Sequence, residues 1–517
     1  MVKKIIKIIS GLLLCVSTIA VYGQQDNIVL RLHFAGVDKL TADKEATNIN
    51  KILSLQESAD FKGEVFKKLS VQIGTMFKNI SAEQCNLFNP ILDDLYKREW
   101  CLVVYRQKDT VSEAVLAVSI PADKASIWND NLINLTEISG GRKPSNKKFG
   151  SANGWEGKIN GDLNLLRLAR IGEWTVIGLA TNKFNTFEDI VHKIQKKNFP
   201  QPFNSNNWLE AEINLDWFTK AIKMPITGGA DFASLRIYNR GGEMKTAVAL
   251  HYPAGIKWNY QPLQPPRGLI YDPIVSFTAI SGSSSLLNEI SIIKQLKLKS
   301  VPDQLYLWGQ GLTPFSTYFA VPVADATNLM NELAIKLPPL IISSNSVSAV
   351  GNVFWVSNKA ELVWRGLPLM TPFLKAASDT NGQYIYGGLF PPAAKEKSPA
   401  PPELFKQILN RTNLMYYDWE YTGDRVLQWI QIYQILFLFT SVEQVPESKP
   451  GQKWLVKIAK DLGETATEIV VKNPQEVLIM RRSTLGLTGF ELLQLTRSVD
   501  LPDTKNNTKP NSKMKKK

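Results

Sequence analysis

The sequence predicts an α+β protein of two tandem related units, each built from antiparallel sheets and amphipathic helices. Three observations lead to this fold class: pairs of short apolar strands joined by turns, amphipathic helices between the pairs, and an internal echo at a spacing of about 200 residues. With 517 residues, 44% of them hydrophobic, the chain can bury large cores but is too long for a single one. We therefore expect two or more domains.

The N-terminus has the pattern of a secretory signal peptide. Three lysines precede a mostly apolar run, and a small residue follows that run: Lys3, Lys4, Lys7, residues 8–21 and Gly23. A positive region, an apolar region and a small-residue cleavage site in this order predict that residues 1–23 are removed on export. We therefore expect the mature protein to be extracytoplasmic, either periplasmic or secreted.

Two alternatives concern the same segment. A lipoprotein would use Cys15, but Leu14 is bulky where a small residue is wanted, and the apolar run continues beyond the cysteine. An uncleaved anchor would need about 20 apolar residues, which is longer than this run. Further along, residues 426–442 are largely apolar but carry three glutamines at helical spacing. We expect a helix packed in a domain core there, and no membrane span in the mature chain.

The first elements of the mature chain are a strand and a group of helices. Residues 28–34 alternate with period two, with Leu30 on one face and Arg31 on the other, which predicts a half-buried strand. Helical periodicity then dominates residues 43–96.

Paired apolar strands follow, joined by short turns that are polar or contain glycine. The pairs predicted to form antiparallel hairpins are 101–107 with 113–120, 163–172 with 173–181, and 353–358 with 360–366. After the second pair, residues 186–194 predict an amphipathic helix with Thr186 as its N-cap.

A later part of the chain echoes an earlier one. Pro121 and Pro322, 201 residues apart, each end a predicted strand, and an alanine and a leucine follow both prolines at the same spacings. Asp325 is expected to cap the helix after the later strand. A second match, 208 residues apart, aligns the acidic segment 210–216 with 418–424. Because the two matches keep their order, they predict a duplicated unit of roughly 200 residues.

Proline-rich segments set the expected boundaries. The join at residues 260–268 divides the mature chain into a first unit, 24–262, and a second unit, 263–499. A further proline-rich break at residues 390–403 is expected to be an exposed loop within the second unit. The lysine-rich end, residues 500–517, is expected to be a disordered basic tail.

Charge and cysteine content narrow the class of partner. The net charge is +13, but part of it belongs to the signal peptide and the tail, and basic residues are not interleaved with aromatics along one element. We therefore expect no nucleic-acid partner. After signal cleavage only Cys85 and Cys101 remain. They could form one disulfide or stay as buried thiols, and in either case the fold is not built on disulfides.

Two acidic pairs are the candidates for chemistry: Glu210 with Glu212, and Asp418 with Glu420. Residues i and i+2 of a strand point to one face, so each pair could bind calcium or divide acid and base roles as in glycoside hydrolysis. The alternative is a solvent face on an edge strand, with Asp216 and Asp424 as N-caps of the helices that follow. Recurrence in both units favours this alternative, because a repeated cap explains a repeated spacing.

Other catalytic and cofactor patterns are absent from the sequence. There are three histidines, His33, His192 and His251, none at zinc-ligand spacing, and there is no CxxC, P-loop or GxSxG motif. Residues 281–285 lack the closing glycine of the last motif and are expected to be a flexible loop. We expect no cofactor.

The 13 tryptophans of this exported chain raise a carbohydrate-binding hypothesis, because sugar rings stack on exposed indoles. Four of them lie in apolar strands, where large aromatics usually fill cores: Trp174, Trp308, Trp355 and Trp364.

The signal peptide, the stretches LRLHFAGVDKL and TADKEATNINKIL, and the hairpin RIGEWTVIGL resemble those of uncharacterised exported bacterial proteins of a domain-of-unknown-function type. The resemblance covers most of the mature chain. It implies an extracytoplasmic location and no particular activity, cofactor or catalytic residue.

Together these patterns favour a non-enzymatic binding or scaffold protein of the cell envelope, with a ligand held between the two units. Candidate partners are an envelope glycan, a lipid headgroup or another protein. The alternatives are a hydrolase of envelope polymers that uses the paired carboxylates, and a purely structural envelope component.

Overall fold

The structure is a computed structural model that describes residues 27–75, 77, 80–108, 110–199, 206–217, 229–258, 261–311, 316–343, 351–367, 370–391, 398–439 and 444–501. The predicted signal peptide, all but two residues of the predicted tail, and parts of the segments 260–268, 390–403 and 426–442 lie outside these ranges. Among the described helices, none is long and apolar enough to span a membrane.

Twenty strands of the described chain form one antiparallel sheet. The strands before residue 260 are β1 Ile28–Phe34, β2 Trp100–Gln107, β3 Thr110–Ser119, β4 Ser145–Phe149, β5 Ala152–Lys158, β6 Leu165–Ile171, β7 Trp174–Ala180, β8 Asn207–Asn214, β9 Phe232–Arg240 and β10 Glu243–His251. The later strands are β11 Ile274–Ser281, β12 Gln304–Gln310, β13 Thr317–Val323, β14 Asn352–Val356, β15 Glu361–Arg365, β16 Phe373–Asp379, β17 Gly382–Gly388, β18 Leu414–Tyr421, β19 Glu464–Asn473 and β20 Glu476–Ser483. The three predicted hairpins are confirmed as β2–β3, β6–β7 and β14–β15.

Helices lie between the strand pairs, so the mixed α+β class is confirmed. The α-helices are α2 Val37–Ala42, α3 Thr47–Leu53, α4 Gln56–Gly74, α5 Asn89–Lys97, α6 Ala122–Gly140, α7 Phe187–Gln195, α9 Ser283–Leu287, α10 Ser291–Leu296, α11 Ala326–Ser343, α12 Pro402–Lys406, α13 Thr422–Phe439, α14 Pro450–Ile458 and α15 Gly489–Asp500. Short 3₁₀ helices are η1 Gln84–Phe88, η2 Arg267–Leu269, η3 Ser357–Lys359 and η4 Ala459–Asp461.

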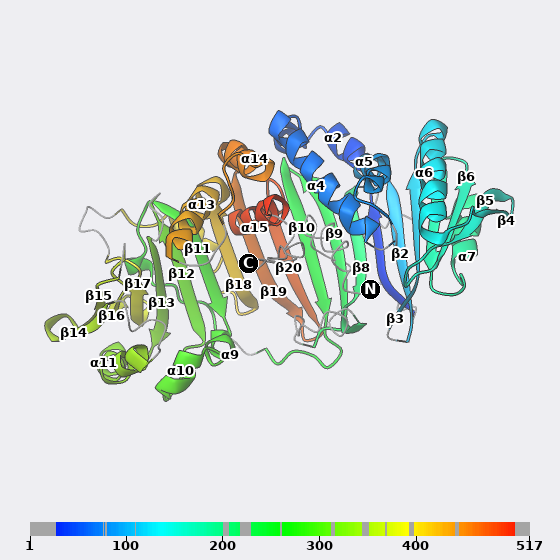
Figure 1. The fold of residues 1–517 in the computed structure, drawn as a ribbon. Coiled ribbons are helices and arrows are strands. Elements are labelled where there is room, and N and C mark those ends of the chain that lie inside the picture. Colours follow the sequence, from blue (N-terminus) through cyan, green and yellow to red (C-terminus); the bar gives the residue numbers. More distant parts are fainter. Residues whose placement is uncertain are drawn as a thin grey trace, which may run out of the picture.

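The strand order repeats from each edge of the sheet to its centre. From one edge the ladders run β4-β5-β6-β7-β3-β2-β1-β8-β9-β10. From the other edge they run β14-β15-β16-β17-β13-β12-β11-β18-β19-β20. β10 and β20 pair with each other at the centre, so each strand of the first set has a counterpart ten numbers later (Figure 1).

The sheet has two faces, which register assigns strand by strand. We call face A the one that carries Leu235, Val248 and Ile479, and face B the one that carries Arg236 and Met480; paired residues of neighbouring strands share a face. Helices α4, α6, α11, α13, α14 and α15 supply residues to the apolar clusters on face A. Helices α7 and α12 supply residues to the clusters on face B.

Strand β1 is more central than its sequence predicts. It lies between β2 and β8, and both faces are covered: Leu32 is buried on face A, and His33, 6% exposed, is buried on face B. The ring Nε2 of His33 lies 2.8 Å from Oε1 of Glu99. The expectation of a half-buried strand was wrong because polar side chains that find partners can line a buried face.

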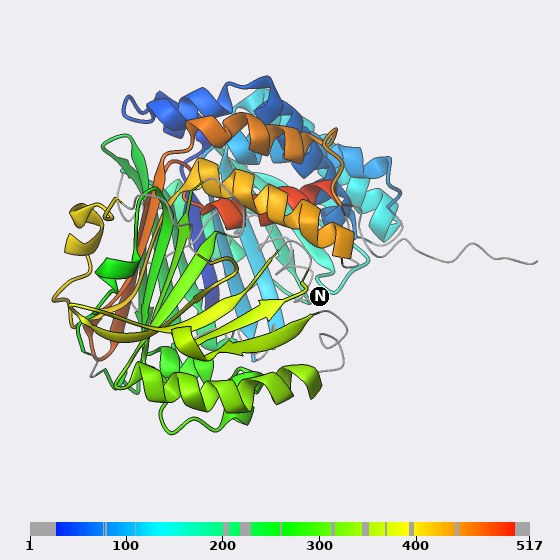
Figure 2. The ribbon, with the colours of Figure 1, turned by 90° about the vertical axis from the view of Figure 1, so that its left-hand side faces the viewer.

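The apolar cores do not divide at residue 262. One cluster joins Phe61 of α4 to Val426, Trp454 and Leu492 of the last three helices. Figure 2 shows α4 (blue) alongside α14 (orange) on one side of the sheet, although they are far apart in sequence. The phenyl ring of Phe61 stacks on the indole of Trp454, with ring centroids 4.7 Å apart and an angle of 12° between the planes.

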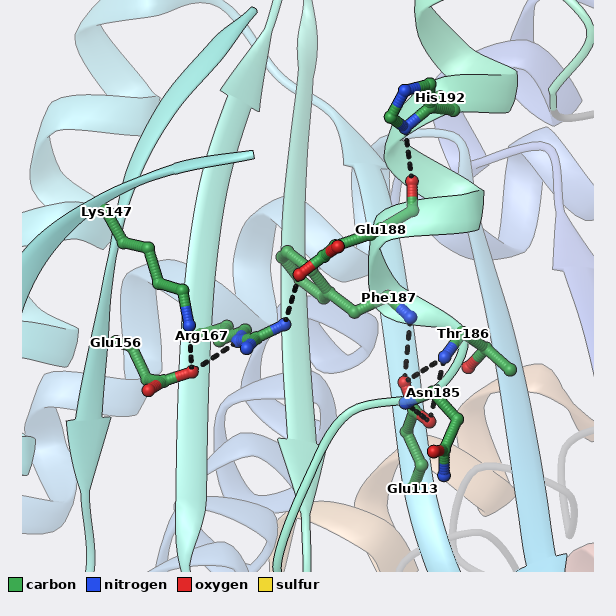
Figure 3. A network of polar contacts seen from close by, with 9 residues as sticks. All are labelled: Glu113, Lys147, Glu156, Arg167, Asn185, Thr186, Phe187, Glu188 and His192. Atoms are coloured by element: carbon green, nitrogen blue, oxygen red, sulfur yellow. Dashed lines mark hydrogen bonds and ion pairs between the residues drawn. The ribbon is translucent and has the colours of Figure 1, made fainter. Parts of the chain in front are cut away.

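Helix α7 begins at a buried carboxylate from another element. Thr186 occupies the N-cap position as predicted, but its side chain makes no capping bond. Instead Glu113 of β3, fully buried, accepts hydrogen bonds from the backbone N–H groups of Asn185, Thr186 and Phe187 at 2.8–3.2 Å (Figure 3). A carboxylate satisfies more of the free N–H groups of a helix start than a hydroxyl can.

Beside this helix, Arg167 of β6 is held from several sides. Its guanidinium donates to Glu156 at 2.6 Å and to Glu188 of α7 at 3.2 Å (Figure 3). It also lies over the ring of Phe184, 4.3 Å from the centroid. Since these partners satisfy the charge of Arg167 within the fold, we interpret the network as one that holds α7 against the sheet and not as a binding site.

Three smaller expectations have definite outcomes. Asp325 caps α11 by accepting a hydrogen bond from the N–H of Asn328 at 2.9 Å, as predicted. Residues 281–285, expected to be a flexible loop, instead enter α9, where Ser283 donates to the carbonyl of Pro302. Cys85 and Cys101 are buried free thiols, and burial raises the pKa of both.

Candidate functional site

Strand β18 presents different chemistry to the two faces of the sheet. Its sequence alternates aromatic and acidic residues over Tyr417–Tyr421. Register places Asp418 and Glu420 on face A, opposite Thr467 and Thr465 of β19. The intervening aromatics therefore point to face B.

A pocket of about 430 Å³ lies on face B beside these aromatics. It is lined by the start of β11, by α12 and its N-terminal flank, and by single residues of β19 and β20. The lining residues are Asp272, Pro273, Ile274, Pro401, Glu403, Leu404, Gln407, Tyr417, Trp419, Tyr421, Glu464 and Arg482. Its volume falls in the range of small-molecule sites, and its lining combines apolar, aromatic and charged groups as such sites do.

The aromatic wall of the pocket is fixed by hydrogen bonds. The indole Nε1 of Trp419 donates to Oε2 of Glu464 at 3.2 Å, and the rings of Trp419 and Tyr421 meet edge to face with centroids 4.8 Å apart. Tyr421 is 44% exposed. Below them the hydroxyl of buried Tyr417 donates to Gln407 at 3.1 Å. The rings of Trp419 and Tyr421 are therefore held in place at the pocket wall and remain accessible to a ligand.

Among the lining residues that the structure describes, carboxylates outnumber cations. Arg482 supplies the one guanidinium, and it lies 3.8 Å from Glu464 and 3.5 Å from Glu243 of β10. Burial raises the pKa of Tyr421, and the negative charges of Glu464 and Asp272 raise it further. These two carboxylates therefore lie close enough to the Tyr421 hydroxyl to disfavour its ionisation further.

The pocket's edge near β11 is held by backbone contacts. The N–H of Asp272 donates to the carbonyl of Ser398 at 2.9 Å, and Tyr271 forms an isolated bridge with Pro399. These contacts place the segment before α12 against the start of β11. Two sides of the pocket, 130 residues apart in sequence, are thereby fixed to each other.

All of the described lining residues belong to the predicted second unit. The ligand was expected between the two units, but β10 and β20 pair directly at that junction and continue the sheet across it. The pocket instead borders the junction through Arg482, which pairs with Lys245 of β10.

On the opposite face, Asp418 and Glu420 are enclosed beneath α13 and α15. Asp418 accepts a hydrogen bond from Thr278 at 2.7 Å, and Glu420 accepts one from the N–H of Gly489 at 2.6 Å. Burial raises the pKa of Glu420 to about 7, and it also raises the pKa of Asp418. Glu420 is 5% exposed, so this pair is a buried polar cluster and not a solvent face.

Glu210 and Glu212 lie on face B of the first half. Arg31 of β1 donates to Glu212 at 3.2 Å, and Asn207 donates to Glu210. Burial raises the pKa of Glu212. Both strands that carry the acidic pairs are central in the sheet, so the expected edge-strand setting was wrong.

The structure does not bring the four candidate metal ligands together, because one pair faces A and the other faces B. Within the described ranges, no group of three or more His, Cys, Asp or Glu side chains is arranged to hold a metal ion. The caps expected at Asp216 and Asp424 were wrong: Asn214 accepts the N–H of Trp217 at 2.9 Å, and Asp424 lies inside α13, which begins at Thr422.

Sequence reasoning missed the pocket residues Trp419, Tyr421, Glu464 and Arg482. The alternation within β18 was read for its acids alone, although the same period assigns the aromatics to a shared opposite face. The tryptophans expected to fill cores differ among themselves: Trp308 is 1% exposed, whereas Trp355 and Trp364 are only half-buried.

Comparisons with known proteins identify no family for the chain. No protein-family model matches it, and no curated protein matches it. Among solved structures, crystal form I of TP0453 is similar in part, with 10% sequence identity over 45% of this chain and 77% of that one, at a TM-score of 0.24.

Proposed function

We propose that this chain is an exported, non-enzymatic binding protein of the cell envelope that holds a small polar ligand in the face-B pocket. The observation that carries the proposal is the setting of Trp419, whose indole lines the pocket and is oriented by Glu464. A fixed aromatic ring at a pocket wall, with polar groups around it, suits recognition of a flat ligand face.

The state of the pocket carboxylates favours binding over hydrolysis. Glu464 already accepts from the Trp419 indole and lies near Arg482, and Glu403 pairs with Lys406 at 3.2 Å. A glycosidase needs two carboxylates that divide acid and base roles across a bound bond. Carboxylates held by neighbouring donors are suited instead to orienting a ligand.

The export part of the proposal is supported by the N-terminal sequence. Lysines before an apolar run and a small residue after it indicate removal of residues 1–23. The prediction is checked by mass spectrometry of the protein purified from its native host. The mature chain is expected to begin at Gln24, and a chain that retains Met1 would contradict export by cleavage.

We further infer that residues 24–262 and 263–499 are two copies of one unit. The shared strand order from edge to centre supports this inference. The echo between Pro121 and Pro322 also supports it. When β3 and β13 are aligned on these prolines and the alignment is extended from strand to paired strand as far as the centre of the sheet, Thr246 becomes the equivalent of Arg481.

Thr246 and Arg481 are paired across β10 and β20, which is where a two-fold axis between two related units would pass. The same register makes Trp419 the equivalent of Glu210. Under this alignment the aromatic pocket of the second unit corresponds to the charged, buried cluster of the first. A binding role would thus belong to one unit alone.

Thermal unfolding of the mature chain tests the binding proposal. The panel consists of calcium, other divalent metals, envelope glycans and lipid headgroups. A ligand of the native state stabilises it by about 2.7 kcal/mol when its free concentration is about 100 times Kd. We expect a saturable rise of the midpoint with a glycan, and a smaller rise at the same glycan concentration in Trp419→Ala and Glu464→Gln.

The control is Phe354→Ala, which removes an exposed aromatic ring from the outer strand β14, at the far end of the sheet (Figure 1). It should keep the shift. A shift that neither pocket variant reduces would place the ligand elsewhere. No shift with any compound would favour the structural alternative.

A further inference from the structure

We infer that the ligand of the face-B pocket is a saccharide with a free amino group. The inference rests on the proposed function, and it adds the chemical class of the ligand. It depends on two features of the lining, the balance of charges and the position of the rings.

The charges in the lining favour a cation. Among the described lining residues, three carry carboxylates, Asp272, Glu403 and Glu464, and one, Arg482, carries a guanidinium. That guanidinium is shared with a further carboxylate, Glu243, outside the pocket. An anionic ligand would meet mainly like charge, whereas an ammonium group would find acceptors, in competition with Lys406 at Glu403 and with Arg482 at Glu464.

The rings supply the second part of recognition. Trp419 and Tyr421 stand edge to face at one wall, beside Glu464, and Tyr421 pairs with Glu464 across the β18–β19 ladder. A sugar ring can lie against an aromatic face while its amino group reaches the neighbouring carboxylate, and an ammonium near an aromatic face gains a cation–π term. Apolar residues, among them Leu404 and Ile274, also line the pocket.

Calorimetric titration of the mature protein with matched sugars tests the inference. The probes are β-1,4-linked tetrasaccharides of glucosamine, of N-acetylglucosamine and of glucose, which share a ring and linkage but differ at one substituent. We expect the glucosamine form to bind at least tenfold more tightly than the other two, and to weaken as salt is raised.

Two variants assign that binding to the pocket. Trp419→Ala should weaken it about tenfold, and Glu464→Gln, which keeps an acceptor for the indole, about fivefold. The matched controls Phe354→Ala and Glu289→Gln change an exposed ring and an exposed carboxylate elsewhere and should leave binding unchanged. Wild-type circular dichroism in each variant shows that the fold is kept.

The alternatives give different results. Equal binding of the neutral tetrasaccharides, with the same dependence on Trp419, would overturn the inference and leave the proposed function in place. Tetralysine that binds as tightly as the amino sugar would show that the pocket selects amines and not saccharides, which also overturns it. Failure of every compound to bind at this pocket would overturn both proposals.

Discussion

At the scale of single residues, the fold buries the ionisable carboxyl of Glu420, which lowers the stability of the folded state when that carboxyl is charged. Its carboxyl is buried beneath the start of α15 and accepts one hydrogen bond, from the N–H of Gly489. Burial raises its pKa from 4.5 to about 7; nearby Asp418 and Glu491 act in the same direction, and the hydrogen bond and Arg425 oppose them. Between these two values the folded chain binds a proton that the unfolded chain has lost.

Stability is therefore expected to fall as the pH rises from 4.5 through 7, because unfolding releases a proton over this window. The full effect above pH 7 is about 3 kcal/mol. Glu420→Gln keeps an acceptor for Gly489 but cannot ionise, so the variant should be more stable than the wild type at pH 8 and nearly equal to it at pH 5. Urea unfolding at both pH values measures this.

The exposed substitution Glu289→Gln serves as the control for a lost carboxyl. If Glu420→Gln changed the free energy of unfolding by the same amount at pH 5 and pH 8, the assigned titration would be wrong. The test separates the charge of Glu420 from its packing, because the two side chains have nearly the same shape.

At the scale of elements, the space beside a helical glycine determines whether the protein can accept a methyl group there. At Gly423, in the first turn of α13, a Cβ would lie 2.1 Å from the carbonyl oxygen of Ala459 in η4. At Gly63, within α4, a Cβ would meet nothing within 4 Å. The same substitution should therefore have opposite effects in the two helices.

Gly423→Ala should destabilise the protein by about 2 kcal/mol or more, since backbone must move to admit the methyl group. Gly63→Ala should stabilise it by about 0.5–1 kcal/mol, because alanine loses less backbone entropy and has the higher helix propensity. Chemical denaturation of both variants gives the two values. A stabilising Gly423→Ala would mean that α13 and η4 are not in close contact.

Elements are also where prediction from sequence succeeded. Paired apolar runs joined by short turns identified the hairpins, and Asp325 was found as a cap because its target lies three residues away. The sequence did not predict that the Glu113 carboxylate holds the start of α7. Glu113 lies more than 70 residues earlier, and no local pattern links it to that helix.

The pocket was not predicted from the sequence for the same reason, because its residues are far apart along the chain. Alternation in β18 assigns Trp419 and Tyr421 to one face, but their partners come from Asp272, Glu464 and Arg482, which register alone brings close. The sequence also could not tell that the acidic pairs face opposite sides. The 208-residue sequence match aligns Glu210 with Asp418, whereas the register of the paired strands aligns Glu210 with Trp419. A shift of one residue along a strand reverses the face to which a side chain points.

At the scale of the whole molecule, sheet and helices tie the two halves together. The central ladder joins β10 to β20, and α4 packs on α14 and α15. Phe61, 9% exposed, carries part of this helical contact by stacking on Trp454, whose indole donates to Ser58 at 2.9 Å. Unfolding of one half would expose apolar surface of the other.

We therefore expect the mature chain to unfold in one cooperative transition, with coincident midpoints by circular dichroism and tryptophan fluorescence. Phe61→Ala should lower that single midpoint and cost about 3 kcal/mol, because a buried ring is lost from a contact shared by both halves. Phe354→Ala, on the outer strand β14, should cost less than about 1 kcal/mol. Two separate transitions in the wild type, with Phe61→Ala shifting only one of them, would show that the halves fold independently and that the shared core contributes little to holding them together.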